Sequence, residues 1–177
     1  TDSRGAWREN KANGGLLMEV PTRATLLRGL SMPHSPRWYD NKLWFLESGQ
    51  GSIAQADARH GTWRTVAQMP GFTRGLDFYG PLAFIGLSQV RESATFSGIP
   101  LVERLEERTC GVWIVDLRDG RVLGFLRFEE GVQEIFAVQV LPGVRFPDML
   151  EWNDERLKNS YVLPDDALAE VPEEMRE

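Results

Sequence analysis

Ser52-Ile53-Ala54-Gln55-Ala56-Asp57-Ala58-Arg59-His60-Gly61-Thr62-Trp63 is the stretch that decides the fold, because its pattern occurs a second time. The second copy is Val112-Trp113-Ile114-Val115-Asp116-Leu117-Arg118-Asp119-Gly120-Arg121-Val122. In both copies an apolar strand ends in an aspartate, and a glycine stands four residues after it. An aspartate side chain can cap a tight turn and glycine readily adopts a positive φ, so each copy predicts a β-hairpin. A weaker copy, Leu16-Leu17-Met18-Glu19-Val20-Pro21-Thr22-Arg23, lacks the glycine.

A second recurring pair of strands lies between these hairpins. It runs over residues 35–46 as a strand, a tight turn and a strand, and again over residues 74–85. Residues 134–140 read as a third opening strand before the turn Leu141-Pro142-Gly143. Four short strands at about 40 residues per unit match the period of a β-propeller blade. A β-sandwich is the main rival fold, but a sandwich does not require this repetition.

The sequence therefore predicts an all-β fold, a partial β-propeller of about two and a half four-stranded blades with one loop-helix insert. The strands of a blade are labelled A to D from the axis outward. The predicted propeller fragment then divides into residues 1–32 (strands C and D of a blade), 33–70 (a full blade), 71–128 (a full blade with the insert 88–109), 132–140 (the inner strand of a further blade) and 144–177 (a C-terminal tail). The acidic residues of the tail are expected to be a solvated end of the chain.

The insert 88–109 is too long for a simple hairpin connection. Pro100 suits the first turn of a helix, and Leu101 and Leu105 form an apolar i, i+4 pair, so a short helix is expected. Long loops in compact domains are usually functional or disordered. Two interpretations stay open, a lid over the mouth of the propeller and an excursion of the chain that only packs on it.

The composition excludes several classes of function. The formal net charge of −6 and the pI of about 5.1 argue against a nucleic-acid partner, because phosphate binding needs a basic surface. No apolar run approaches the length of a membrane span and no signal peptide is visible, so no membrane partner and a cytoplasmic location are expected. Cys110 is the only cysteine, which permits no internal disulfide, and it is expected to be a buried structural thiol. His34 and His60 are the only histidines, so the sequence contains no Cys/His metal motif.

The strand directions predict which loops share a face. Successive strands of a blade are antiparallel, so the D-to-A and B-to-C connections open on one face and the tight turns on the other. The tight turns read as structural hairpins, and they are Asp40-Asn41-Lys42, Arg59-His60-Gly61, Gly80-Pro81 and Arg118-Asp119-Gly120. The first face carries the more polar connections and is the predicted binding face. The candidate binding residues on it are His34, Ser35, Arg37, Arg74, Arg91, Glu92 and Glu134.

Two functions remain open on this face, and whether the protein is an enzyme stays open with them. The first is a binding or recognition module for a small molecule or peptide, with His34, Arg74 and Glu134 around an axial mouth. The second is a hydrolase-type enzyme, with His34 or Glu134 as general base and Arg74 stabilising an anion. Hydrolysis would need a metal or an activated nucleophile, and the cofactor is unknown; a divalent ion at Glu134 is one alternative. Arg74 and Glu134 could also form only a structural ion pair between blades.

Several short motifs together resemble a known family. They are Gly29-Leu30-Ser31-Met32-Pro33-His34-Ser35-Pro36-Arg37-Trp38, Pro70-Gly71-Phe72-Thr73-Arg74-Gly75-Leu76, Gly86-Leu87-Ser88, Arg91-Glu92-Ser93 and Cys110-Gly111-Val112-Trp113. Over nearly the whole chain they resemble the uncharacterised propeller-like family called domain of unknown function 4915, whose members are sometimes joined to tetratricopeptide repeats. The resemblance implies the propeller fold and no particular activity. More distantly, the blades are similar to calcium-dependent lactonase propellers, which use several axial carboxylates and an asparagine; here Glu134 alone is placed for that role.

The resemblance also implies that further blades precede this part of the chain in the longer family members. Family members are about twice as long, and this chain resembles their C-terminal half, which ends in a segment like Asn159-Ser160-Tyr161-Val162-Leu163-Pro164. A blade made only of strands C and D, and an inner strand with no strand after it, would leave sheet edges open. Open edges invite pairing with another strand, so the expected partners are preceding blades of a longer chain or a second copy through self-association.

Overall fold

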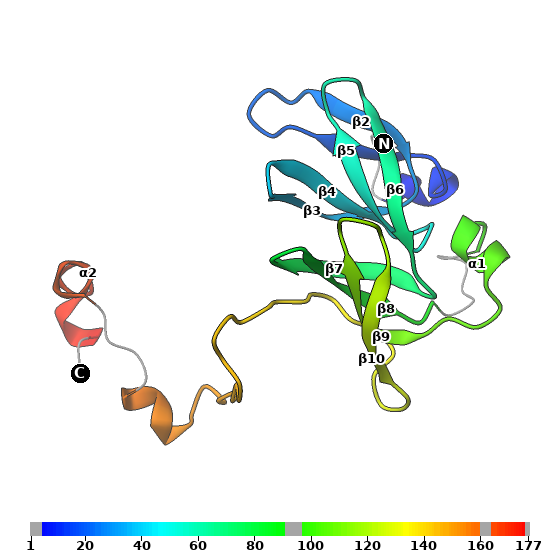
Figure 1. The fold of residues 1–177 in the computed structure, drawn as a ribbon. Coiled ribbons are helices and arrows are strands. Elements are labelled where there is room, and N and C mark those ends of the chain that lie inside the picture. The colour runs from blue at the N-terminus through cyan, green and yellow to red at the C-terminus, as the bar shows by residue number, and fades with distance from the viewer. Residues whose placement is uncertain (1–4, 91–96, 160–163, 176–177) are drawn as a thin grey trace. The chain divides into compact units, whose positions relative to one another are not determined.

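The computed structural model describes residues 5–90, 97–159 and 164–175. The chain forms two compact units, Thr1–Pro142 and Gly143–Glu177, and each is described by itself. Regular structure in the first unit is almost entirely β-strand, which confirms the all-β fold class (Figure 1).

The described strands of the first unit form three antiparallel sheets. Sheet A pairs β1 (Gly15–Met18) with β2 (Thr25–Leu30). Sheet B has the strand order β3-β4-β5-β6, with bounds Pro33–Tyr39, Lys42–Glu47, Ser52–Asp57 and Thr62–Gln68. Sheet C has the order β7-β8-β9-β10, with bounds Phe72–Tyr79, Leu82–Ser88, Cys110–Asp116 and Val122–Phe128. The sheets are separate and do not close into a ring, so the propeller arrangement stays a prediction.

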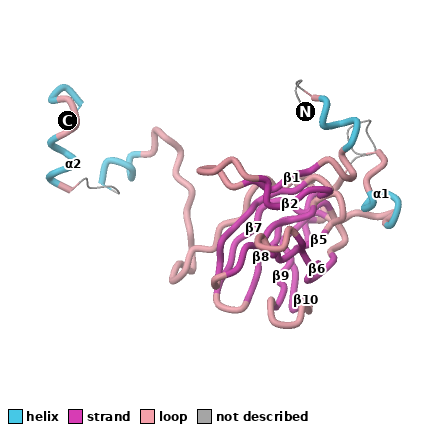
Figure 2. The backbone as a smooth tube through the Cα atoms, turned by 90° about the horizontal axis from the view of Figure 1, so that it is seen from above, coloured by secondary structure: helices cyan, strands magenta, loops and turns pink. Residues whose placement is uncertain are grey.

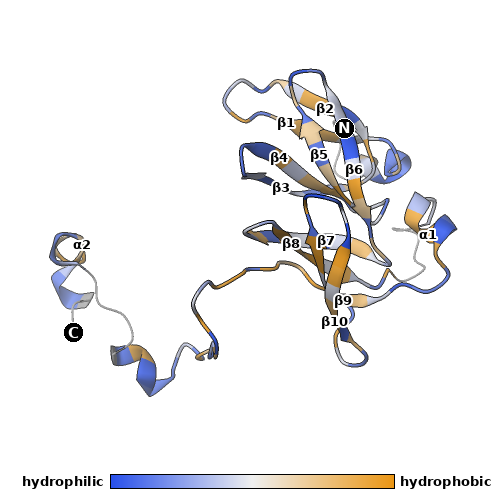
Figure 3. Ribbon diagram, in the orientation of Figure 1, coloured by the Kyte–Doolittle hydropathy of each residue, from blue (hydrophilic) through white to orange (hydrophobic). Residues whose placement is uncertain are grey.

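Sheet B packs between the other two sheets, and apolar side chains hold all three together. One buried cluster joins sheet A to sheet B and consists of Leu17, Leu27, Leu30, Phe45 and Ala54. A second joins sheet B to sheet C and includes Trp44, Leu46, Ile53, Leu76, Phe78, Ile85, Leu87, Trp113 and Val115. Burying one large apolar side chain stabilises a fold by about 1.5–3 kcal/mol, so these clusters are the main support of the stack. The strands of the three sheets lie close together when seen from above (Figure 2), and hydrophilic residues gather at several of the hairpin turns (Figure 3).

The hairpin turns follow the chemistry predicted from the two aspartates. Asp57 Oδ1 accepts the backbone N–H groups of Arg59 and His60, and Asp116 Oδ1 accepts that of Arg118. Gly61 and Gly120 have φ angles of 66° and 76°, as the pattern requires. These observations confirm both predicted hairpins.

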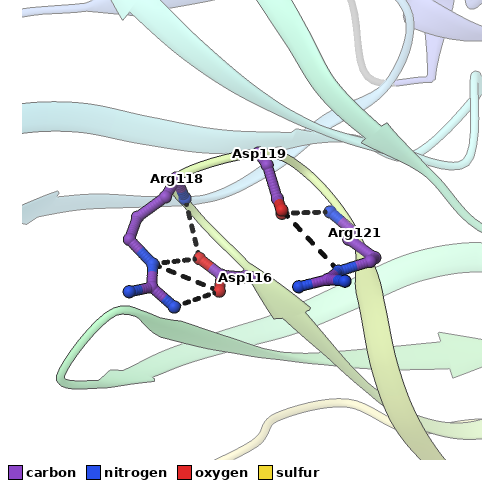
Figure 4. Close-up of polar contacts among 4 residues, drawn as sticks. All are labelled: Asp116, Arg118, Asp119 and Arg121. Atoms are coloured by element: carbon purple, nitrogen blue, oxygen red, sulfur yellow. Dashed lines mark hydrogen bonds and ion pairs between the residues drawn. The ribbon is translucent and has the colours of Figure 1, made fainter.

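The turn between β9 and β10 also carries charged contacts (Figure 4). The Arg118 guanidinium donates to both carboxylate oxygens of Asp116, and the Arg121 guanidinium lies 3.6 Å from the carboxylate of Asp119. Hydrogen bonding from the side chain and backbone of Arg118 lowers the pKa of Asp116 to about 2. The Asp116 carboxylate thus stabilises the turn, which agrees with the interpretation of the tight turns as structural hairpins.

Residues 132–140 are placed against sheet C but belong to none of the described strands. The Ser88 hydroxyl donates to the Ile135 carbonyl at 3.2 Å, and the backbone N–H of Val140 donates to Asp77. The expected β-strand is therefore not part of any described sheet, although the backbone N–H of Gln89 donates to the Gln133 carbonyl at 2.8 Å. Whether it is the inner strand of a further blade stays a prediction.

The insert forms the expected short helix, α1 (Pro100–Arg104), with Pro100 in its first turn. Leu101 and Ile99 are fully buried and pack against Phe72 and Val90. The backbone N–H of Leu101 donates to the carbonyl of Gly49, which ties the helix to the β4–β5 connection. The described part of the insert therefore packs on the ends of sheets B and C, and both interpretations of the insert stay open. Residues 91–96 of the insert lie outside the described residues.

The remaining helical turns are short. The first unit begins with the 3-10 helix η1 (Ala6–Asn10). The second unit contains η2 (Glu155–Asn159), α2 (Asp165–Ala169) and η3 (Glu173–Met175), and Arg156 bridges Asp148 and Asp154 within it. None of the helices in the described ranges has the length and apolar character needed to cross a membrane.

Gly75 on β7 gives the first test of this packing. Its φ is +82°, and a Cβ there would lie 2.7 Å from the Val138 nitrogen. Strained backbone and overpacking together should make Gly75→Ala lower the free energy of unfolding by roughly 2–4 kcal/mol, measured by urea denaturation. Gly131 has a φ of +79° and open space around it, so Gly131→Ala, which has the backbone strain without the overpacking, is the matched control and should lower stability less. Equal effects of both substitutions would show that residues 132–140 do not pack on β7.

Candidate functional site

A pocket of about 250 Å³ opens beside His34. The 3-10 helix η1, the start of β1 and the start of β3 form its walls, so it lies where sheet A meets sheet B. The residues lining it are Trp7, Asn10, Lys11, Gly14, Gly15, Met32, Pro33 and His34. The N-terminal segment that carries Trp7 and Lys11 thus lies beside His34.

The imidazole of His34 is held in one orientation by its Nδ1 atom. Nδ1 lies 3.0 Å from the Met32 carbonyl and 2.9 Å from the Ser48 hydroxyl. The Ser48 hydroxyl itself donates to the Thr73 carbonyl, so its oxygen is left to accept. A carbonyl can only accept, and this network therefore assigns the proton to Nδ1 and leaves Nε2 as an acceptor. No partner of Nε2 occurs among the described side chains and backbone.

The surroundings of His34 favour its neutral form. Partial burial is the largest effect and lowers the pKa of the imidazole. The hydrogen bond to Met32 opposes it, and the positive charge of Arg74 adds a smaller lowering. The Phe72 ring meets the imidazole edge-on, with ring centres 5.7 Å apart. His34 is thus a neutral acceptor at the wall of a pocket near pH 7.

Ser35 and Arg74, two of the predicted binding residues, lie near His34. The Ser35 hydroxyl accepts the backbone N–H of Gly75 at 3.2 Å, which joins β3 to β7. Arg74 on β7 places its guanidinium 4.3 Å above the centre of the Phe136 ring. Ser35 therefore fixes the backbone, while Arg74 acts on His34 through its charge.

Ser35 and Arg74 do not line this pocket, and neither do Arg37 and Glu134. Arg37 lies beyond an irregularity in the β3–β4 ladder, is exposed, and donates to the carbonyl of Pro36. Glu134 is exposed and forms no ion pair with Arg74. Burial raises the pKa of Cys110, and the charge of Glu134 adds a smaller effect in the same direction. Arg91 and Glu92 lie outside the described residues.

Sequence reasoning missed one carboxylate near the site. Glu47 is only 5% exposed, although it ends β4 at a connection expected to be polar and open. Its Oε1 accepts the Ser31 backbone N–H at 3.1 Å and its Oε2 accepts the Trp63 indole N–H at 3.0 Å. Both oxygens are therefore occupied in holding the end of sheet A to sheet B. The only sequence signal was the indole of Trp63, a donor that needs a partner when it is buried.

A second pocket, of about 570 Å³, lies at the tight-turn ends of sheets B and C. Its lining includes Tyr39, Lys42, Pro81 and Arg118. The Tyr39 ring stacks on Phe78 and its hydroxyl donates to the Gly80 carbonyl, so its polar group is already used. In the described ranges, no group of three or more His, Cys, Asp or Glu side chains is arranged to hold a metal ion.

The fold and the pocket together define an all-β protein of stacked antiparallel sheets with a small site at one sheet junction. A family model described as a domain of unknown function, DUF4915, matches residues 1–150. The chain belongs to this family, as its sequence motifs predicted. A comparison with functionally curated proteins gives no match.

The lowered pKa of His34 predicts how the free energy of unfolding depends on pH. The unfolded chain takes up a proton at His34 near pH 6.5, whereas the folded chain takes it up only at lower pH. Stability should therefore fall as the pH decreases through 6.5 and stop falling, for this residue, below the folded pKa. Urea denaturation between pH 7.5 and 5 should show this slope in the wild type and a smaller slope in His34→Gln. Arg37→Gln, at an exposed cation of the same strand, should keep the wild-type slope; an unaltered slope in His34→Gln would contradict the assignment.

Proposed function

We propose that this chain is a section of a β-propeller that acts as a binding module for a small molecule or the end of a peptide in the His34 pocket. The observation that carries the proposal is a concave site of about 250 Å³ walled by a neutral, fixed imidazole. Concave, mostly apolar sites with a few placed polar groups are where proteins usually bind small ligands. The propeller, the repeated blade and the cytoplasmic location are parts of this proposal.

The lining residues suggest the chemistry of the ligand. His34 Nε2 is an acceptor and would pair with a hydroxyl or amide N–H of the ligand. Trp7 is partly exposed and offers an aromatic surface, and Met32 and Pro33 add apolar area. The Lys11 ammonium is the cationic group among the lining residues. A small aromatic or apolar molecule with a hydrogen-bond donor fits this set.

The alternative is a hydrolase in which His34 acts as general base. The contact between His34 Nδ1 and the Ser48 hydroxyl is the observation that raises it, because a serine beside a histidine can be a nucleophile. Here Ser48 is fully buried and its proton is directed to the Thr73 carbonyl rather than to the imidazole. The serine thus serves as a support of the histidine, and binding is the function this geometry favours.

The proposal is tested with small aromatic fragments that carry an amide or a hydroxyl group. Saturation-transfer NMR should find fragments that bind the wild-type protein, and His34→Gln and Trp7→Ala should each weaken them about tenfold, near 1.4 kcal/mol. His60→Gln is the matched control, because His60 is an exposed histidine on a tight turn. Fragments whose binding is unaffected by both pocket substitutions would refute the site. Turnover of an ester fragment that is lost in His34→Gln would instead support the hydrolase.

A further inference from the structure

The short helix α1 is attached to the chain close to the His34 pocket, although it does not line the pocket. The lining residues come from η1, the start of β1 and the start of β3, and none belongs to α1. α1 has five residues, and an isolated helix of this length is not stable in water. Its position therefore depends on the contacts that it makes with the rest of the chain.

The first set of contacts joins α1 to the connection between β4 and β5. The Leu101 N–H donates to the Gly49 carbonyl at 2.9 Å, and the Arg104 guanidinium donates to the next carbonyl along the chain, also at 2.9 Å. Ser48 comes directly before Gly49, and its hydroxyl lies 2.9 Å from His34 Nδ1. The connection that holds α1 is thus the connection that orients the imidazole.

The fit between α1 and this connection is close. A Cβ on Gly51 would lie 2.7 Å from the Leu101 Cδ1 atom, so glycine is what lets the leucine approach the backbone. The Arg104 guanidinium also lies 3.4 Å from the Met69 carbonyl, where the chain runs past the same connection. A shift of α1 would therefore disturb the connection as well as the helix.

The second set of contacts is apolar and leads to the wall of the pocket. Ile99 and Leu101 are fully buried in one cluster with Phe72. Met32 packs against this cluster and also lines the pocket. The Phe72 ring meets the His34 imidazole edge-on. The buried side chains of the insert are thus one side chain away from the pocket wall and from the imidazole.

Both sets of contacts lead to the same nitrogen atom. The Met32 carbonyl and the Ser48 hydroxyl are the two groups beside His34 Nδ1, at 3.0 and 2.9 Å. The apolar cluster supports Met32, and the backbone bonds of α1 support the connection that carries Ser48. Loss of α1 would weaken both supports, and the proton of the imidazole would then no longer be assigned to Nδ1.

We propose that α1 controls the His34 pocket, with Leu101 and Arg104 as positioning residues that keep the imidazole in its ligand-accepting tautomer. This inference rests on the proposed function, because it concerns the regulation of the same pocket. The docked helix would favour binding of a ligand. Coupling between two sites is reciprocal, so a ligand in the pocket would also favour the docked helix. Detachment of α1 would release the ligand.

NMR of the histidine ring nitrogens tests the positioning without a ligand. In isotope-labelled protein His34 should show one tautomer with the proton on Nδ1, and the exposed His60 is an internal reference. Leu101→Ala and Arg104→Gln should each give a mixture of His34 tautomers and faster hydrogen exchange at the backbone N–H of position 101. Glu103→Gln, at the exposed position before Arg104, is the matched control and should change neither signal.

Binding of benzamide, a small aromatic amide, tests the coupling to the pocket. Leu101→Ala and Arg104→Gln should each weaken its affinity about tenfold, which lies within the usual range of coupling between two sites. Glu103→Gln should bind it as the wild type does. Saturating benzamide should slow hydrogen exchange at the 101 N–H of the wild-type protein, because coupling acts in both directions.

The two measurements separate failure of this inference from failure of the proposed function. A wild-type protein that binds no benzamide, while Leu101→Ala alters the His34 tautomer, would contradict the proposed function and support the positioning by α1. Variants that exchange faster at position 101 but keep the wild-type tautomer and affinity would overturn the inference. If Leu101→Ala is unfolded, its dispersed NMR signals are lost, and Arg104→Gln at an exposed position decides the result.

Discussion

Neighbouring side chains on β4 point to opposite faces of sheet B, and both sets are apolar. A sheet with two apolar faces cannot be stable in water unless another layer covers each face. Sheet A covers one face and sheet C covers the other. Burial of Trp44 on one side and Phe45 on the other therefore dictates a stack of at least three sheets. The turns, the insert and the pocket all take their positions from that stack.

The close approach of the inner strands is the second requirement of the stack. Glycine, which has no Cβ, permits this approach. Gly75 on β7 lies directly against the backbone of residues 137 and 138. Hydroxyl groups then bridge the layers, with Ser35 accepting from Gly75 and Ser48 donating to Thr73. The same contacts fix the orientation of His34, because the Ser48 hydroxyl donates to the Thr73 carbonyl and also contacts His34 Nδ1. The pocket and the packing are thus parts of one network.

Local sequence signals predicted the local structure well. Asp57 and Asp116, each followed by a glycine, specified their turns because an aspartate cap and a positive φ are short-range effects. Long-range features were harder to predict. Arg37 was expected beside His34, but the positive φ of Ser35 breaks the regular ladder between the two residues and separates them. The burial of Glu47 was not predicted, because the sequence does not show that the Ser31 N–H and the Trp63 indole meet its carboxylate.

For the segment 132–140 the sequence predicted a strand but could not predict its pairing. Its alternation of apolar residues predicts a strand, and its placement against sheet C agrees with an inner position in a new layer. A strand, however, is defined by a partner as well as by its own residues, since its hydrogen bonds go to a neighbouring backbone. No described strand supplies that neighbour, so the segment is extended without being part of a sheet. An apolar pattern that predicts a strand thus also predicts a partner strand, and the described strands of the first unit do not include one for this segment.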